Sequence, residues 1–207
     1  MRSLGDDMIL DPCRRSQVLP LPVVLISTIS KEGVRNAAPW GCVTPILRPL
    51  DEILIVSWIK RDTLDNIRQT GEFVVNVPSI DMVEEVTTCA KPFPPQVDEF
   101  DEAKLIPRPS TKVKPPGIEG CLSWMECTLS EEILREKFSL IIGKVVHLEV
   151  DDRFFNEMGE MDLEKAKPMC MIVEQRYTYP MDSKLSQKYS EMFLKKDDLA
   201  RFESQTK

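Results

Sequence analysis

Short runs of β-branched and apolar residues, separated by turn and proline signals, recur along most of the chain and limit its possible folds more than any other feature. The clearest run is 23–29, and Lys31, Glu32 and Gly33 follow it with hairpin-turn chemistry. Further strand candidates are 36–45, 53–59, 73–77, 122–129, 138–150 and 169–173. About seven short strands with brief helices between them predict a mainly β fold, a small antiparallel barrel with peripheral helices.

Proline and glycine positions refine this outline. Two prolines among small residues make 36–45 an irregular edge strand and loop, because proline cannot donate a hydrogen bond within a sheet. A short helix is expected from Thr63 to Thr70, with Asp62 as its N-cap and Gly71 placed to end it. Two further helices and a proline-rich loop are expected at 79–89, 98–105 and 108–120, respectively.

Two strands in the second half of the chain are expected to form a hairpin. The runs 122–129 and 138–150 are joined by residues 130–132, which we interpret as an acidic, solvated turn. In the second strand the alternation indicates one core-facing side and places His147 on the other side. The predicted core-facing residues are Leu140, Ile142, Val146, Leu148 and Val150.

The composition supports a full core and one main domain. The chain has 207 residues, of which 42% are hydrophobic, and a chain of this size buries about 70% of its unfolded surface on folding. We expect a domain at 20–180, preceded by an extension at 1–19 and followed by an amphipathic helix at 181–207. Its apolar stripe suits packing on the domain or on a partner and consists of Leu185, Tyr189, Met192, Leu199 and Phe202.

Charge and hydropathy argue against two classes of partner. The 27 basic and 34 acidic side chains give a net charge of −7, which disfavours nucleic-acid binding because such proteins usually carry a basic surface. The longest run without a polar side chain, 18–26, is far shorter than the roughly 20 residues that a membrane span requires. The N-terminus lacks the basic and apolar pattern of a secretory signal, so a cytoplasmic location is expected.

Cysteine and histidine usage argues against a metal site. Six cysteines stand at 13, 42, 89, 121, 127 and 170, and none forms a C-x-x-C pair, so we expect free, buried thiols. His147 is the single histidine, which excludes any site that needs two. The sequence contains no G-x-G-x-x-G, and a Rossmann nicotinamide domain is therefore not expected.

Four motifs between residues 22 and 78 carry a family resemblance. They are Pro-Val-Val-Leu-Ile-Ser-Thr at 22–28, Asn-Ala-Ala-Pro-Trp at 36–40, Val-Ser-Trp-Ile-Lys-Arg-Asp-Thr-Leu-Asp-Asn-Ile at 56–67 and Thr-Gly-Glu-Phe-Val-Val-Asn-Val-Pro at 70–78. In their order and spacing the chain resembles the flavin-reductase-like FMN-binding family, which includes flavoredoxins. Shorter matches at 98–103, 118–127 and 142–146 extend the resemblance over about 20–173. It implies a split β-barrel that binds FMN, usually as a homodimer with the flavin near the subunit interface.

The resemblance directs attention to a phosphate site before the predicted helix 63–70. A flavin phosphate is best held by backbone N–H groups at a helix start and by cationic side chains. Lys60 and Arg61 supply the cations there, and Thr63 adds a hydroxyl group. The alternative is an ordinary capped surface helix with a solvated Lys-Arg pair.

The flavin ring requires a flat apolar slot with main-chain donors and acceptors, which small residues near a bent backbone provide. In the family, the stretch that corresponds to 38–44 lies against the ring and its ribityl chain. The residues to which this role is transferred are Ala38, Pro39, Trp40, Gly41, Cys42, Val43 and Thr44. Trp40 either stacks on the flavin or fills the core. Ser57 either reaches the ribityl chain or bonds to the backbone of its own strand.

Two regions leave the function open. Lys91, at the start of a proline-stiffened segment, either approaches the flavin or belongs to a surface connection. The nicotinamide-using members of the family commonly carry a histidine beside an acidic residue before the strand that ends in Gly-x-Val. This chain has Glu-Lys-Phe-Ser there, at 136–139.

Two functions remain, and no catalytic residue is assigned for either. The first is an oxidoreductase that transfers electrons through bound FMN, supplied by NAD(P)H or by a redox partner protein. The second is a non-catalytic flavin-binding or electron-carrier module that acts through a partner protein. A split barrel with another ligand, such as haem, ranks last because the chain has a single histidine.

Overall fold

The computed structural model describes residues 9–47, 50–173 and 178–180. Its main element is a seven-stranded antiparallel sheet with the strand order β3-β2-β6-β9-β10-β5-β4. These strands are β2 (Val24–Ile29), β3 (Arg35–Trp40), β4 (Val43–Pro45), β5 (Glu52–Trp58), β6 (Glu72–Val77), β9 (Ser123–Leu134) and β10 (Phe138–Val150). Two small sheets pair β1 (Leu21–Pro22) with β11 (Cys170–Val173) and β12 (Thr178–Pro180), and β7 (Pro107–Arg108) with β8 (Gly117–Ile118).

The two edges of the large sheet lie close together in the chain. Strands β3 and β4 are the two ends of the strand order, yet only Gly41 and Cys42 separate them in sequence. Because two linking residues span only about 10 Å, the sheet must curl until its edges approach each other. The result is a barrel whose ladder is interrupted between β3 and β4. The predicted mainly β, antiparallel split barrel is confirmed.

Short helices decorate this barrel, and their bounds follow local signals. They are α1 (Asp62–Thr70), α2 (Val83–Cys89), α3 (Glu99–Glu102) and α4 (Leu163–Ala166), with 3-10 turns η1 (Pro12–Gln17), η2 (Ile80–Met82) and η3 (Asp152–Phe154). Ser79 and Asp98 accept backbone N–H bonds at the starts of η2 and α3, as caps should. Gly71 ends α1 with a left-handed φ of 73°, as predicted.

The predicted cap of α1 was wrong. Asp62 is the first helical residue, and the N-cap position belongs to Arg61, whose side chain makes no capping hydrogen bond. The start of α1 therefore lacks the side-chain oxygen that usually satisfies its first N–H groups.

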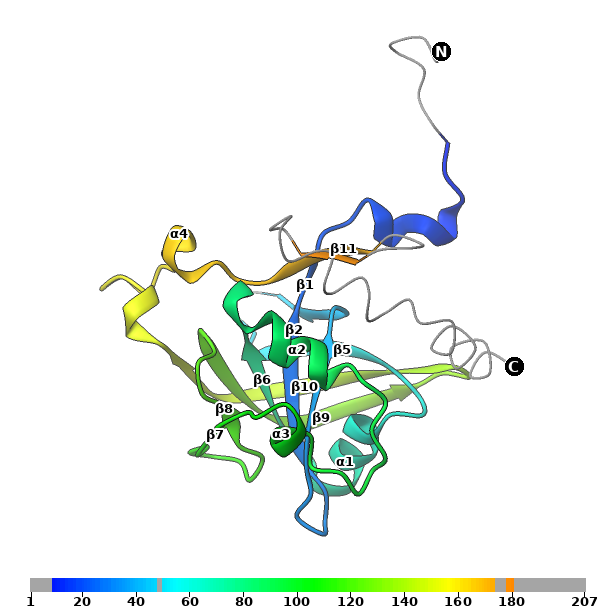
Figure 1. The fold of residues 1–207 in the computed structure, drawn as a ribbon. Helices are drawn as coiled ribbons and strands as arrows, with labels where there is room; N and C mark the ends of the chain where they lie inside the picture. Colours follow the sequence, from blue (N-terminus) through cyan, green and yellow to red (C-terminus); the bar gives the residue numbers. More distant parts are fainter. Residues whose placement is uncertain (1–8, 48–49, 174–177, 181–207) are drawn as a thin grey trace.

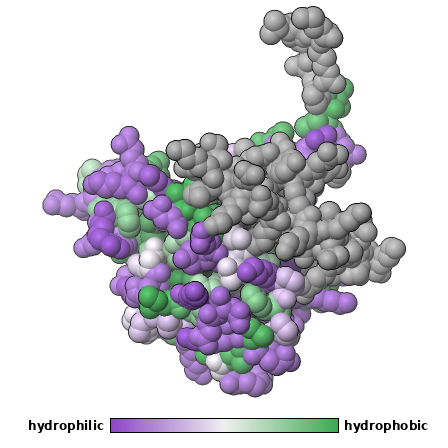
Figure 2. All heavy atoms as spheres, in the orientation of Figure 1, coloured by the Kyte–Doolittle hydropathy of each residue, from purple (hydrophilic) through white to green (hydrophobic). Residues whose placement is uncertain are grey.

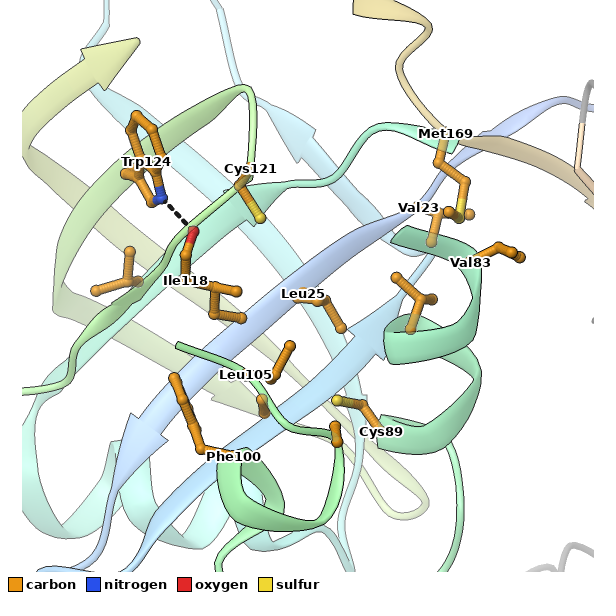
Figure 3. Close-up of a cluster of buried hydrophobic side chains, with 14 of the residues drawn as sticks. Val23, Leu25, Val83, Cys89, Phe100, Leu105, Ile118, Cys121, Trp124 and Met169 are labelled. Atoms are coloured by element: carbon orange, nitrogen blue, oxygen red, sulfur yellow. Dashed lines mark hydrogen bonds between the residues drawn. The ribbon is translucent and has the colours of Figure 1, made fainter. Parts of the chain in front are cut away.

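The sheet separates two hydrophobic cores, and β2 contributes to both. Inside the curl, Ile26 packs with side chains from β5, β6 and β10 and with Leu64 and Ile67 of α1. On the opposite side, Leu25 packs with residues of α2, α3 and the segment around β8. Figure 3 shows Phe100, Leu105 and Cys89 directed toward Leu25 in this second core. Burial on both faces explains why 23–29 is apolar at almost every position.

The hairpin of β9 and β10 differs from its prediction. Residues 130–132 belong to β9, and the reversal occurs at 135–137 instead. An acidic side chain is accommodated in the strand because Glu132 pairs with Arg68 of α1 at 2.6 Å and accepts a hydrogen bond from Ser139. The predicted acidic turn was therefore wrong.

The core-facing side of β10 also differs from its prediction, although Val146, one of the predicted residues, packs against the core that contains Leu25. Ser139, Ile141 and Gly143 are buried, whereas Leu148 and Val150 are exposed. Gly143 faces the inner core, as the collision that a Cβ atom there would make with the Phe73 ring shows. Register shifts after Ile142 and after Val145 further disturb the alternation.

The small sheet of β1, β11 and β12 lies beside the curl, and α2 and α3 pack over β3 (Figure 1). The face drawn in Figure 2 is mainly hydrophilic, with separate apolar patches. Among residues 9–47, 50–173 and 178–180, no helix is long and apolar enough to cross a membrane. The predicted amphipathic helix at 181–207 lies outside the described residues, as do residues 1–8 of the extension at 1–19.

Candidate functional site

A buried polar network ties the start of α1 to the edge strand β3. Thr63 Oγ1 donates to Asn36 Oδ1 at 2.9 Å, and Asn66 Nδ2 donates to Thr28 Oγ1 at 3.0 Å. Thr28 Oγ1 lies 3.3 Å from Asn36 Oδ1 and completes the network. All four side chains are buried, so β3 and the N-terminus of α1 are held in one fixed arrangement.

Glu99 of α3 extends this network from the other side of β3. Its Oε2 atom accepts hydrogen bonds from the Ala37 backbone N–H and from Asn36 Nδ2, both at 2.8 Å. The residue is 6% exposed. Burial raises the pKa of this carboxyl group to about 8, and the negative charges of Asp62 and Asp98 act in the same direction.

The end of β5 lies beside the turn between β3 and β4. Val43 pairs with Ile55, and the Val56 N–H donates to the Cys42 carbonyl oxygen at 3.0 Å. Ser57, the next residue of β5, is buried and donates its hydroxyl hydrogen to the Trp58 carbonyl oxygen at 2.8 Å. The backbone-bonded alternative for Ser57 is therefore present in the structure.

The predicted ring-binding stretch 38–44 spans the split. Ala38, Pro39 and Trp40 are half-buried on β3. Ala37 directs its N–H away from β2, toward Glu99. Residue 39, two positions further along the strand, would direct its N–H to the same outer side. Pro39 is therefore tolerated, because its missing N–H costs no hydrogen bond to β2. The Trp40 side chain packs on the inner core, and its Nε1 atom is buried without a hydrogen-bond partner in the described part of the chain.

The remainder of this stretch divides between packing and exposure. Gly41 lies close to the small sheet, since a Cβ atom there would lie 2.6 Å from the terminal methyl group of Met171. Val43 belongs to the inner core. Cys42 and Thr44 are exposed, and the Thr44 hydroxyl donates to the Pro45 carbonyl oxygen at 3.1 Å. Only part of the stretch therefore presents side chains to a ligand.

The predicted phosphate residues surround the start of α1. Lys60 is exposed and Arg61 is half-buried. Thr63 is buried, and its hydroxyl hydrogen points to Asn36 rather than outward. Asp65 faces away, since it is exposed and lies 3.6 Å from Arg68 on the next turn.

Lys91 is exposed just past the end of α2, after the C-cap residue Ala90. Its position beside a flavin stays a prediction.

These features fit a flavin. The start of α1 lacks a side-chain cap and has two cationic residues next to it, which suits a phosphate group. The edge of β3 offers outward backbone groups, and the buried Trp40 Nε1 is a donor without a partner among the described residues. Sequence reasoning missed Thr28, Asn36 and Asn66, whose only signal is a polar side chain at a position surrounded by apolar ones.

Comparison with known proteins agrees with this reading. The model of the flavin reductase like domain matches residues 15–168. The chain belongs to this family. Flavin reductase-like domains thus account for every strand of the large sheet and for α1, α2 and α3.

Individual relatives extend along most of the chain. An uncharacterized protein of Methanothermobacter thermautotrophicus is 51% identical over 174 residues, which are 82% of this chain and 82% of that protein. The crystal structure of nitrilotriacetate monooxygenase component B from Bacillus cereus has a TM-score of 0.76 and 25% identity, and the match covers 86% of this chain and 98% of that one. Flavoredoxin of Desulfovibrio vulgaris shares the fold with a TM-score of 0.72 at 20% identity, over 88% and 93% of the two chains.

Proposed function

We propose that this protein is an FMN-binding oxidoreductase of the flavin reductase and flavoredoxin type. The observation that carries the proposal is the start of α1, where uncapped helix N–H groups, Lys60 and Arg61 lie next to the edge strand β3. A phosphate group is the part of FMN that such a site recognises. Membership of the flavin reductase-like family supports a flavin as the ligand that carries this phosphate.

The chain's own residues would hold and orient the cofactor. The helix start and the two cations bind the phosphate, and Ala38, Pro39 and Trp40 line the ring at the split. The outward backbone carbonyl groups of β3 offer acceptors to the edge of the ring, and the buried Trp40 Nε1 supplies a donor. The inner core behind Trp40 excludes water from one side.

When bound, FMN supplies a ring that accepts and releases hydride or single electrons. The protein therefore needs no acid or base of its own for electron transfer, and we assign no catalytic residue. His147, the single histidine, lies 3.6 Å from Glu149 on β10. His147 therefore belongs to a different element from the proposed phosphate site, which lies at the start of α1.

The flavin content of the purified protein tests this proposal. We expect a yellow protein with flavin absorption bands that releases FMN, and not riboflavin, on denaturation. Protein purified without flavin is expected to bind added FMN at one site per chain. A colourless protein that fails to bind added FMN would overturn the proposal.

The second candidate is an electron-carrier module that acts through a partner protein, and the tip of the β9–β10 hairpin favours it. Residues 135–137 form the exposed turn between β9 and β10 and include no histidine, in contrast to the nicotinamide-using members of the family. Anaerobic mixing separates the two candidates. Rapid bleaching of bound FMN by NADH or NADPH supports a reductase, whereas bleaching only by dithionite or a reduced redox protein supports the carrier.

A further inference from the structure

The Asn36 side-chain amide lies between the Glu99 carboxyl group and the Thr63 hydroxyl group and is hydrogen-bonded to both. Thr63 Oγ1 donates to Asn36 Oδ1, and Asn36 Nδ2 donates to Glu99 Oε2. Asn36 thus accepts a hydrogen bond from Thr63 and donates one to Glu99. In this arrangement the Thr63 hydroxyl hydrogen is used inside the protein.

The same three side chains can bond in the opposite direction when Glu99 carries a proton. A protonated carboxyl group is a donor, and the oxygen and nitrogen of an asparagine amide occupy nearly the same space. If the Asn36 amide turns over, Glu99 donates to Asn36 Oδ1, and Asn36 Nδ2 donates to the hydroxyl oxygens of Thr63 and Thr28. Every bond among the three is kept, and the hydroxyl hydrogens of Thr63 and Thr28, which both donate to Asn36 Oδ1 before the turn, become available to other acceptors.

We propose that Glu99 is a positioning residue which, through Asn36, decides whether the Thr63 hydroxyl donates into the protein or to a phosphate group at the start of α1. The identity of that phosphate as the phosphate of FMN rests on the proposed function. Phosphate binding and protonation of Glu99 are then coupled: each strengthens the other by the same factor.

The charges around Glu99 favour its protonated form. Burial is the largest cause of its raised pKa, and the charges of Asp62 in α1 and of Asp98, the N-cap of α3, raise the pKa further. Arg35 of β3 does not offset them, because its guanidinium group pairs with Asp98 at 2.7 Å and with Asp101 at 2.8 Å.

From α2, two further groups face this region. The buried Glu85 Oε2 atom has no hydrogen-bond partner among the described residues, and the Cys89 thiol stays neutral because burial raises its pKa to about 12. With a pKa of about 8, Glu99 changes its protonation state close to neutral pH.

The first arm of the test follows the relay without flavin. In flavin-free full-length protein, the Asn36 side-chain amide and the Ala37 backbone amide should shift together in a nuclear magnetic resonance titration, with a midpoint near the Glu99 value of about 8. Glu99→Gln should abolish the shift, and Glu102→Gln, an exposed position of the same helix, should retain it. An Asn36 amide that does not respond overturns the relay whether or not flavin binds.

The second arm compares FMN with riboflavin, which lacks the phosphate. The preference for FMN should fall about tenfold between about pH 6.5 and about pH 9 in the native protein, beyond the fall seen with Glu99→Gln, because one charge-assisted hydrogen bond is lost. The difference between the two proteins cancels the titration of the phosphate itself. Riboflavin binding should show no such difference.

Thr63 variants separate the relay from a simple effect of charge. Thr63→Val keeps the shape and removes the hydroxyl group, so the extra pH dependence should vanish, whereas Thr63→Ser should restore it. If Thr63→Val keeps the full pH dependence, Glu99 acts through its charge alone and the role of Thr63 is overturned. If no variant binds FMN while the Asn36 amide still titrates, the proposed function fails and the phosphate part of the relay fails with it.

Discussion

Arg61 is the residue whose replacement tests the phosphate site most simply. It occupies the N-cap position of α1 with an extended backbone, next to the helix N–H groups. Arg61→Ala should weaken FMN binding by about 1.5 to 3 kcal/mol, the usual scale of a charge-assisted contact. Isothermal titration calorimetry measures the change. Lys31→Ala, in the exposed turn between β2 and β3, is the matched control and should bind FMN normally.

Riboflavin provides the second control for Arg61. Because riboflavin has no phosphate group, the native protein and Arg61→Ala should bind it with equal affinity. Equal FMN affinity in the two proteins would place the phosphate elsewhere.

Glu99 also predicts a pH dependence of stability. Its folded-state pKa of about 8 exceeds the ordinary glutamate pKa of 4.5, so in this pH range the folded protein holds a proton that the unfolded chain releases. The contribution of Glu99 to the free energy of unfolding should therefore decrease as pH rises from about 4.5 to about 8, by an amount on the order of 5 kcal/mol, and change no further above that range. Urea unfolding of the native protein and of Glu99→Gln measures the difference. Parallel pH profiles for the two proteins would contradict it.

The sequence does not identify this network because its members are distant in the chain. Thr28, Asn36 and Glu99 come from β2, β3 and α3, and their meeting depends on how α3 packs on the edge strand. Lys60 and Arg61, in contrast, could be selected in advance, because a pair of cations before a helix is a local pattern.

At the scale of elements, local signals predicted some helix ends, although the Asp62 cap of α1, also predicted from a local signal, was wrong. Gly71 ends α1 and Ser79 begins η2 as expected. The β9–β10 hairpin was not predictable in the same way. Its acidic residues are stabilised by Arg68 of α1, and its inner face includes Ser139 and Gly143, which an apolar count assigns to the outside. The Arg68–Glu132 ion pair and the packing of the Phe73 ring against Gly143 are both tertiary contacts.

Gly143 yields the prediction that belongs to this scale. A Cβ atom at Gly143 would collide with the Phe73 ring in the inner core. Gly143→Ala should therefore lower the free energy of unfolding by about 1 to 3 kcal/mol, as overpacking usually does. Lys144→Ala, at the next and exposed position of β10, should change it by less than about 0.5 kcal/mol. Equal stability of Gly143→Ala and the native protein would show that the ring can move aside.

At the scale of the molecule, the open split predicts a homodimer. A single barrel interrupted between β3 and β4 leaves one side of the proposed flavin site uncovered, and a second copy can cover it. Trp58 and Phe138 lie opposite each other on β5 and β10, are 37% and 39% exposed, and form an apolar patch suited to that contact. Light scattering should give about twice the chain mass of 23.7 kDa.

Truncation distinguishes the possible dimer contacts. A chain ending at Pro180 lacks the predicted amphipathic helix at 181–207. We expect it to remain dimeric, because the apolar patch lies on the barrel. A native monomer that binds FMN tightly would contradict the shared site, and a monomeric truncated chain would assign the contact to the C-terminal segment.

The central claim is that FMN binds at the split between β3 and β4, with its phosphate at the start of α1. Backbone amide shifts recorded while FMN is added to flavin-free protein test this claim most directly, because they locate the ligand residue by residue. The account predicts that the largest saturable shifts occur at 38–44 and 60–64. Saturable shifts centred on another surface, such as β7 and β8, or no saturable shifts at all, would contradict it.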